Sequence, residues 1–234
     1  MKTNPIIVAL DVESAGEART LVRRLGGHID FYKVGMELYA AAGMPMVREL
    51  LDQGKHVFLD LKLYDIPETV KRTVAQVSRT GARFLTVHAV GSVMRAAVEG
   101  KGGSDLELLA VTVLTSFGRE DLDDLGYSCE VSDMVAVRTR QALAAGVEGV
   151  VASAREAAAV RHIAGPGTIL VTPGVRSAGR DTGDQKRVAT PAEAIRDGAD
   201  YLVMGRQITR AADPAAEAAR VLEEIASMSL TGYH

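Results

Sequence analysis

Residues 56–67 read His-Val-Phe-Leu-Asp-Leu-Lys-Leu-Tyr-Asp-Ile-Pro. Apolar residues alternate through its first eight positions, a pattern typical of a β-strand. Asp60 and Lys62 are two positions apart, so in an extended strand both side chains point to the same face. Burying two charges inside a sheet is tolerable only if they pair. We therefore predict an ion pair at the carboxyl end of this strand.

The strand is predicted to end before Ile66-Pro67, because the residue before a proline avoids the helical region and proline favours the first helical position. Asp65 then adds a second acid just beyond the strand. Neighbouring carboxylates favour the charged form of a lysine, which makes Lys62 a better proton donor than nucleophile. An ordinary structural ion pair would give the same pattern, so the motif alone does not establish function.

The composition describes a globular chain with an ordinary charge balance. It has 234 residues, 47% of them hydrophobic, with a net charge of −3 and one cysteine, Cys129. The length suits one domain over residues 1–234, and the charge argues against nucleic acid or an anionic membrane as partner. A single cysteine excludes an internal disulfide framework and fits a reducing compartment. No leader-like or membrane-spanning apolar run is visible, so we expect a cytoplasmic protein.

The rest of the chain repeats short apolar runs between helical patterns. The predicted strands are residues 6–10, 31–35, 56–63, 84–88, 106–114, 149–152, 168–172 and 201–206. Predicted helices include one capped by Ser14 and closed by Gly26-Gly27, one around 47–51, one over 67–80, one over 131–145 and one opened by Pro214. Residues 117–130 are rich in acids and are interpreted as a surface excursion.

Eight strands alternating with helices predict an α/β fold, a single (β/α)₈ TIM barrel. A doubly wound open sheet is the competing arrangement. The count of eight, and the lack of Gly-x-Gly-x-x-Gly after the first strand, favour the barrel.

In such a barrel the active site lies at the carboxyl ends of the strands. Two groups of candidate residues follow those ends. Strands one to three supply Asp11, Lys33, Asp60, Lys62 and Asp65, and strands seven and eight supply Pro173-Gly174-Val175-Arg176 and Gly205-Arg206. Glycine backbone N–H groups with arginine side chains in these last two loops commonly bind phosphate.

Each of these residues also has a simpler interpretation. Asp11 could cap a helix, and Arg206 alone could be a surface arginine. His88 at a strand end is interpreted as a rim residue that lines the site. Thr115 and its neighbour Ser116 could cap the next element or contact a substrate.

Six segments together resemble one enzyme family. They are Phe-Tyr-Lys33-Val-Gly, Asp60-Leu-Lys62-Leu-Tyr-Asp65-Ile-Pro, Leu-Thr115-Ser, Thr-Pro-Gly-Val-Arg176, Asp-Gln185-Lys-Arg-Val and Met-Gly205-Arg206. Taken in order over nearly the whole chain, they resemble the orotidine 5′-monophosphate decarboxylases. The resemblance implies a homodimeric barrel that uses no metal and no organic cofactor. It also implies conversion of orotidine 5′-monophosphate to UMP and CO₂ in pyrimidine synthesis.

The resemblance also assigns roles to residues. It makes Lys62 the proton donor within a network completed by Lys33, Asp60 and the Asp65 of the partner subunit. The substrate contacts that it implies are Asp11, Lys33 and the partner subunit's Thr69 at the ribose, Thr115 at the pyrimidine, and Arg176, Gln185 and Arg206 at the phosphate, with Pro173 and Gly205 in the same loops. We expect binding of the phosphate to drive closure of the loop over 175–187.

Two other functions remain open. A related sugar-phosphate barrel, 3-keto-L-gulonate 6-phosphate decarboxylase or hexulose 6-phosphate synthase, shares the Asp-x-Lys-x-x-Asp pattern but needs Mg²⁺. Lys33 argues against it, because an ammonium group would repel the metal. A non-catalytic nucleotide-binding barrel would not need the full set of paired charges.

Overall fold

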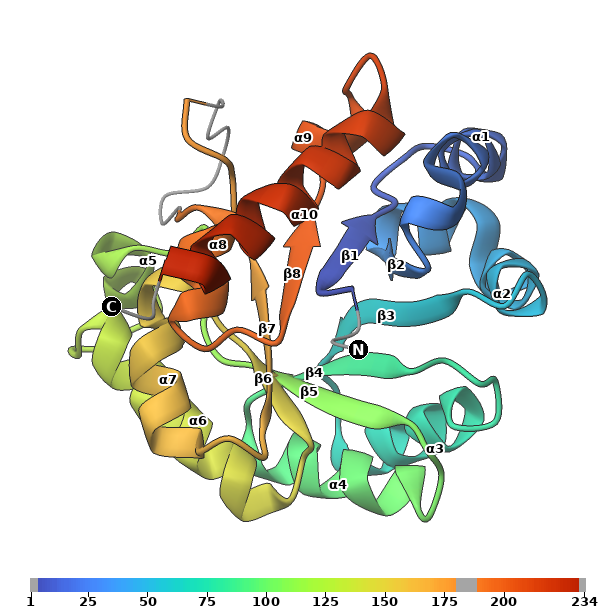
Figure 1. Ribbon diagram of the computed structural model, residues 1–234. Coiled ribbons are helices and arrows are strands. Elements are labelled where there is room, and N and C mark those ends of the chain that lie inside the picture. The colour runs from blue at the N-terminus through green and yellow to red at the C-terminus, as the bar shows by residue number, and fades with distance from the viewer. Residues whose placement is uncertain (1–3, 180–188, 232–234) are drawn as a thin grey trace.

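A closed barrel of parallel strands forms the centre of the molecule (Figure 1). The structure, a computed structural model, describes residues 4–179 and 189–231, with side chains as far as residue 227. Within those residues eight strands pair in chain order, and the last returns to the first, with Ile6 opposite Leu202. The predicted (β/α)₈ barrel is thereby confirmed, and the open-sheet alternative is wrong.

The strands are β1 (Ile6–Ala9), β2 (Phe31–Gly35), β3 (His56–Leu63), β4 (Phe84–His88), β5 (Glu107–Val111), β6 (Gly149–Val151), β7 (Ile169–Pro173) and β8 (Tyr201–Met204). The helices are α1 (Ala15–Leu25), α2 (Met36–Asp52), α3 (Pro67–Val77), α4 (Gly91–Lys101), α5 (Arg119–Asp124), α6 (Val131–Ala145), α7 (Ala157–Ala164), α8 (Pro191–Arg196), α9 (Arg206–Thr209) and α10 (Pro214–Thr231), with short 3₁₀ turns at Gly26–His28 and Ala154–Glu156. Among the described residues, no helix is both long and apolar enough to cross a bilayer.

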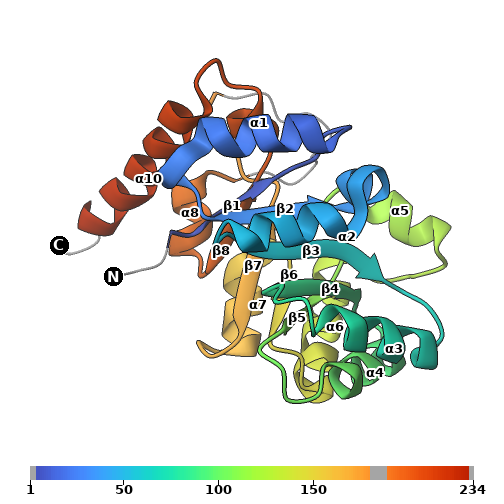
Figure 2. The same ribbon diagram turned by 90° about the vertical axis from the view of Figure 1, so that its right-hand side faces the viewer.

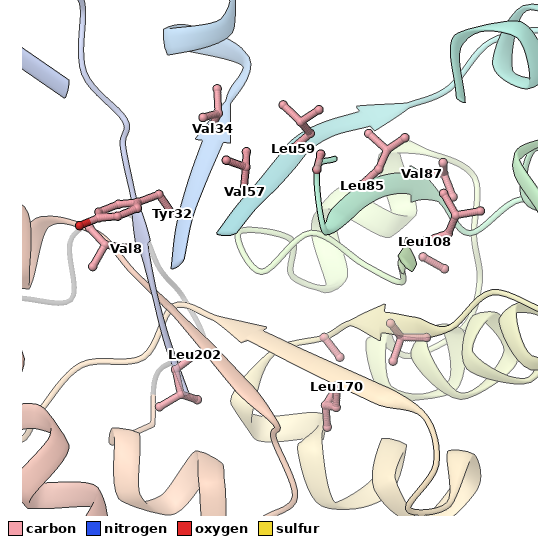
Figure 3. Packing of buried hydrophobic residues seen from close by; sticks show 14 of the residues in the cluster. Val8, Tyr32, Val34, Val57, Leu59, Leu85, Val87, Leu108, Leu170 and Leu202 are labelled. Carbon is pink, nitrogen blue, oxygen red and sulfur yellow. The ribbon is translucent and has the colours of Figure 1, made fainter. Parts of the chain in front are cut away.

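The core has two layers because side chains alternate along each strand. One layer lies between the strands and the surrounding helices, where residues such as Val57, Leu59 and Leu85 are fully buried (Figure 3). The other fills the barrel interior. Asp60 and Thr86 alternate with the outward residues and therefore face this interior.

Aromatic rings close the amino end of the barrel. Phe31, Phe84 and Tyr201 each begin a strand, and their ring centroids lie 5.1–5.7 Å apart. The Arg83 guanidinium group stacks over all three rings at 5.2–5.4 Å. This packing leaves the carboxyl end as the face on which polar side chains can gather.

Several helix boundaries follow local signals in the sequence. Ser14 caps α1 by accepting a hydrogen bond from the Glu17 N–H, and Pro67 begins α3, both as predicted. The predicted helix around 47–51 is instead the end of α2, which starts at Met36. Gly43 (φ 59°), two residues before Pro45, kinks α2, so the sequence does not reveal that α2 is one continuous helix.

The acid-rich segment 117–130 is only partly a surface excursion. It contains α5, whose Leu122 is almost completely buried in the core. Apolar residues are too few there for periodicity to reveal a helix. β5 and β8 are shorter than predicted, because the chain leaves the sheet once it reaches the carboxyl end of the barrel.

Candidate active site

A buried carboxylate organises the carboxyl end of the barrel. The Asp60 Oδ2 atom lies 2.8 Å from the Lys62 Nζ and 3.6 Å from the Lys33 Nζ. The Lys33 Nζ in turn donates to Asp11 Oδ1 at 2.8 Å. The predicted ion pair is therefore one link in a row of alternating charges that crosses three strands.

The pKa of Asp60 results from opposing effects. Burial raises it, but the positive charges of Lys33 and Lys62 lower it, as do hydrogen bonds from Lys62 and Thr86. The attractive interactions outweigh burial, so the pKa of Asp60 lies below its ordinary value. Asp60 is thus an anion at neutral pH, and it holds two ammonium groups in place.

Lys62 has a backbone conformation that its sequence does not indicate. Its φ is +48°, the left-handed region, which is sparsely populated by residues other than glycine. The pairing of β3 with β4 is irregular between Leu59 and Leu63, so the simple alternation predicted for residues 56–63 fails there. Non-glycine residues with such conformations are often found at functional sites, where the surroundings hold them in place.

Thr86 supplies part of that support, and sequence reasoning missed it. Its buried hydroxyl accepts a hydrogen bond from the Lys62 backbone N–H at 2.9 Å and donates to Asp60 Oδ1 at 2.9 Å. One side chain thus fixes both the backbone of Lys62 and the carboxylate that binds its ammonium group. A threonine in an apolar strand gives no signal of this role.

Gly35 is a second residue whose importance is visible only in three dimensions. A Cβ atom there would lie 2.8 Å from the Lys33 Nζ and 3.1 Å from Asp11 Oδ1. A side chain at this position would displace one of the two charged groups.

A cavity of about 640 Å³ is lined by residues from both predicted groups, although Asp60 and Lys62 are not among its lining residues. Its predicted lining residues are Asp11, Lys33, Pro173, Gly174, Arg176, Gly205 and Arg206. Arg210, which sequence reasoning did not single out, also lines the cavity. This volume is in the usual range for sites that bind small molecules. Asp11 is not a helix cap, because Ser14 caps α1.

Three predicted residues in the described part of the chain belong neither to the charged row nor to the cavity lining. Asp65 is exposed in a bend, where its carboxylate accepts from the Ile66 N–H and lies outside ion-pair distance of Lys62. Thr69 is exposed near the start of α3, and Thr115 lies partly exposed in the turn after β5. Gln185 lies outside the described residues.

His88 is a partly buried residue at the end of β4, which agrees with its predicted place on the rim. Its ring packs against Tyr64 with centroids 5.5 Å apart. Burial lowers the pKa of His88, the positive charges of Arg138 and Lys62 lower it further, and Asp60 opposes them. The neutral imidazole therefore predominates at neutral pH.

Comparisons with known proteins agree with this geometry. Residues 4–221 match the family model described as orotidine 5′-phosphate decarboxylase / HUMPS family. Proteins named orotidine 5′-phosphate decarboxylase are similar to the chain: one from a Bradyrhizobium species is 51% identical, with 97% of this chain and 94% of that protein covered, and one from Afipia carboxidovorans is 53% identical, with 96% and 97% covered.

A solved structure shows the same likeness in three dimensions. The crystal structure of orotidine 5′-phosphate decarboxylase from Lactobacillus acidophilus superimposes with a TM-score of 0.84 at 33% identity, and the match covers 95% of this chain and 99% of that one. The matches cover nearly the whole chain, and they are consistent with the charged row at the carboxyl ends of β1 to β3 and with the cavity beside it. The chain belongs to the orotidine 5′-phosphate decarboxylase / HUMPS family.

Proposed function

We propose that the protein decarboxylates orotidine 5′-monophosphate to UMP and CO₂, in pyrimidine synthesis, without a metal or organic cofactor. The observation that carries this proposal is the Lys62 ammonium group, held 2.8 Å from Asp60 on a left-handed backbone. Asp60 also lies 3.6 Å from the Nζ atom of Lys33, and Lys33 lines the cavity together with Arg176 and Arg206. In this proposal the proton donor and the phosphate-binding groups lie at opposite ends of one site.

The reaction explains why a fixed ammonium group is useful. Loss of CO₂ from C6 of the pyrimidine leaves an electron pair in the ring plane, where the π system cannot delocalise it. A preorganised positive charge stabilises that developing anion. The same group then transfers a proton to C6. In our proposal Lys62 does both, while Asp60 and Lys33 keep it oriented.

The substrate contacts form the second part of the proposal. Arg176 and Arg206 bind the phosphate, with Gln185 from the 175–187 loop and with Pro173 and Gly205 shaping the loops. Asp11 and Lys33 contact the ribose, and Thr115 contacts the pyrimidine edge. Because the phosphate is remote from C6, its binding energy can drive closure of the loop.

The third part of the proposal is a symmetric dimer whose sites are shared. Asp65 lies in an exposed bend between Tyr64 and Ile66, whose side chains are 68% and 67% exposed. Large apolar side chains on both sides of an acid suit an interface that carries the acid into another subunit. The partner subunit's Asp65 and the partner subunit's Thr69 would then complete each site. The partner's Asp65 carboxylate would face the substrate carboxylate, a repulsion relieved as CO₂ leaves.

The magnesium-dependent sugar-phosphate enzymes remain the main alternative, since the family model covers more than one activity. Such enzymes need acids that converge on a metal. Here Asp60 has ammonium groups on two sides, and Lys33 also pairs with Asp11, so a divalent cation would meet strong repulsion. The relatives reported above, at 51% and 53% identity, carry the decarboxylase name. The net charge of −3 argues against nucleic acid or an anionic membrane as the partner, and the cavity suits a small nucleotide. We also propose that the protein acts in the cytoplasm.

One spectroscopic experiment separates these functions. The protein is mixed with orotidine 5′-monophosphate in EDTA, and the fall in pyrimidine absorbance is followed. We expect decarboxylation that EDTA does not slow. The Lys62→Ala variant should lose it by several orders of magnitude while still binding UMP. Activity within tenfold of the parent in that variant would refute the role of Lys62. A non-catalytic nucleotide-binding barrel would leave the absorbance unchanged.

A further inference from the structure

The two loops that carry Arg176 and Arg206 are joined by the residues that immediately follow these arginines. The backbone N–H of Ser177, next to Arg176, donates to Gln207 Oε1 at 3.0 Å. The Gln207 Nε2, next to Arg206, donates to the Ser177 Oγ at 2.8 Å. Because a backbone N–H can only donate, it fixes which end of the Gln207 amide is oxygen. The orientation of the amide is therefore determined by its partners.

Helix α10 packs beside α9, which begins at Arg206 (Figures 1 and 2), and side chains of α10 hold the pair in place. Gln207 Nε2 also donates to Glu217 Oε1 at 2.9 Å, and the Ser177 hydroxyl donates to Glu224 Oε2 at 2.6 Å. Arg220 donates to the same hydroxyl at 2.9 Å and to Glu217. The Ser177 hydroxyl thus uses its one donor and both acceptor positions.

This arrangement matters because the two loops present arginines to the same cavity. Arg176, Arg206 and Arg210 line one cavity, together with acids that include Glu13 and Glu17. An anion that binds both Arg176 and Arg206 requires the two loops to keep a fixed separation. A link between the loops keeps that separation before the anion binds, so less of the binding energy of an incoming phosphate is spent on ordering the site.

From this geometry we infer that Gln207 is a positioning residue for phosphate recognition, which fixes Arg206 relative to Arg176 through Ser177. The inference rests on the proposed function in one respect, that Arg176 and Arg206 bind the substrate phosphate. Gln207 itself makes its bonds to Ser177 and Glu217, away from the cavity lining. It acts through the two arginines and does not need to touch the nucleotide.

The test compares ligands with and without the phosphate. Calorimetric titration measures the affinity of the full chain for UMP and for uridine. Gln207→Met keeps the length of the side chain and removes its hydrogen bonds. We expect it to weaken UMP binding about tenfold or more, the scale of one or two lost net hydrogen bonds, and to leave uridine binding within about twofold. Gln141→Met, the same exchange on an exposed position of α6, is the matched control and should change neither affinity.

A double-mutant cycle asks whether the link acts as one unit. If Gln207 and Ser177 act together, then Gln207→Met with Ser177→Ala should weaken UMP binding no more than the stronger single variant. Additive losses would overturn the inference. Equal weakening of UMP and uridine would overturn it too, because a general distortion of the fold would affect both ligands. If Gln207→Met does not fold, Gln207→Asn, which is one methylene too short to reach both partners, takes its place in the same comparison.

Arg206→Ala separates this inference from the proposed phosphate site. If that variant binds UMP as tightly as the parent does, the assignment of the phosphate site is wrong. If Arg206→Ala weakens UMP binding and Gln207→Met does not, the phosphate site stands and the positioning role of Gln207 is refuted.

Discussion

Replacing Thr86 by valine tests how Lys62 is held. The change keeps the shape of the side chain and removes only the hydroxyl that connects the Lys62 N–H to Asp60. A neutral hydrogen bond contributes about 1 kcal/mol to stability, and one to a charged group contributes about 1.5–3 kcal/mol. Asp60 keeps both ammonium partners, which reduces the loss. We therefore expect the free energy of unfolding to fall by about 3 kcal/mol, and the melting temperature by about 6–12 °C for a chain of this size.

The effect on catalysis should exceed the effect on stability. Without the hydroxyl, the left-handed backbone of Lys62 loses a hydrogen bond that holds it, and the residue can relax toward the ordinary extended region. A displacement of about 1 Å in a reacting group can cost about a hundredfold in rate. We expect a loss of that size in kcat for Thr86→Val, measured by the absorbance of orotidine 5′-monophosphate. Thr86→Ser retains the hydroxyl and should stay within about threefold of the parent.

Thr139→Val is the matched control. Thr139 is also fully buried, but its hydroxyl only donates to the Val135 carbonyl one turn earlier in α6. Its loss should change stability by less than about 1 kcal/mol and leave activity unchanged. The reasoning fails if Thr86→Val melts with the parent and has parental kcat, or if Thr139→Val is damaged to the same extent.

Three further predictions concern the partner subunit, the phosphate and pH. When Lys62→Ala and Asp65→Ala subunits are mixed and allowed to exchange, about half of the dimers are mixed and each has one intact site, so about a quarter of parental activity should return; no return despite exchange proven by mass would refute the shared site. Arg206→Ala should cost about 2–3 kcal/mol in kcat/KM for the nucleotide, less than for a buried pair because Arg206 is exposed, and orotidine should be nearly unaffected; equal losses would contradict phosphate binding by Arg206. The lowered pKa of His88 means that its neutral ring stabilises the fold above pH about 6.5 and that this contribution is lost as pH falls through the folded pKa. Between pH about 7.5 and 5, thermal melts of His88→Gln should therefore show a smaller loss of stability than the parent does, and equal losses would rule this out.

Much of the fold was predictable because local and global signals agree. Buried parallel strands appear as continuous apolar runs, and glycine, proline and Ser14 mark the ends of helices. The charged residues at the strand ends could also be identified from the sequence, because a charge in an apolar run must find a partner. The exceptions are places where a local signal misleads, as at Gly43 and Pro45, which look like a break but only kink α2.

The candidate site was less predictable where it depends on contacts between distant residues. The left-handed backbone of Lys62 is stabilised by a threonine 24 positions away, and no pattern within β3 reveals it. Gln207 and Ser177 meet only because β7 and β8 are neighbours in the closed barrel. Asp65 lies just beyond β3, as predicted, but its proposed role involves a second chain and stays a prediction.

The pairing of β1 with β8 has a consequence for how the protein is made. Ile6 is synthesised long before its partner Leu202, which lies at the other end of the barrel in chain order. Until then β1 and the newest strand each present an open edge to other chains, and such edges promote aggregation. A premature stop codon before Tyr201 would leave both edges open permanently and would also remove Arg206. Late truncations of the gene should therefore produce insoluble protein rather than a weakened enzyme.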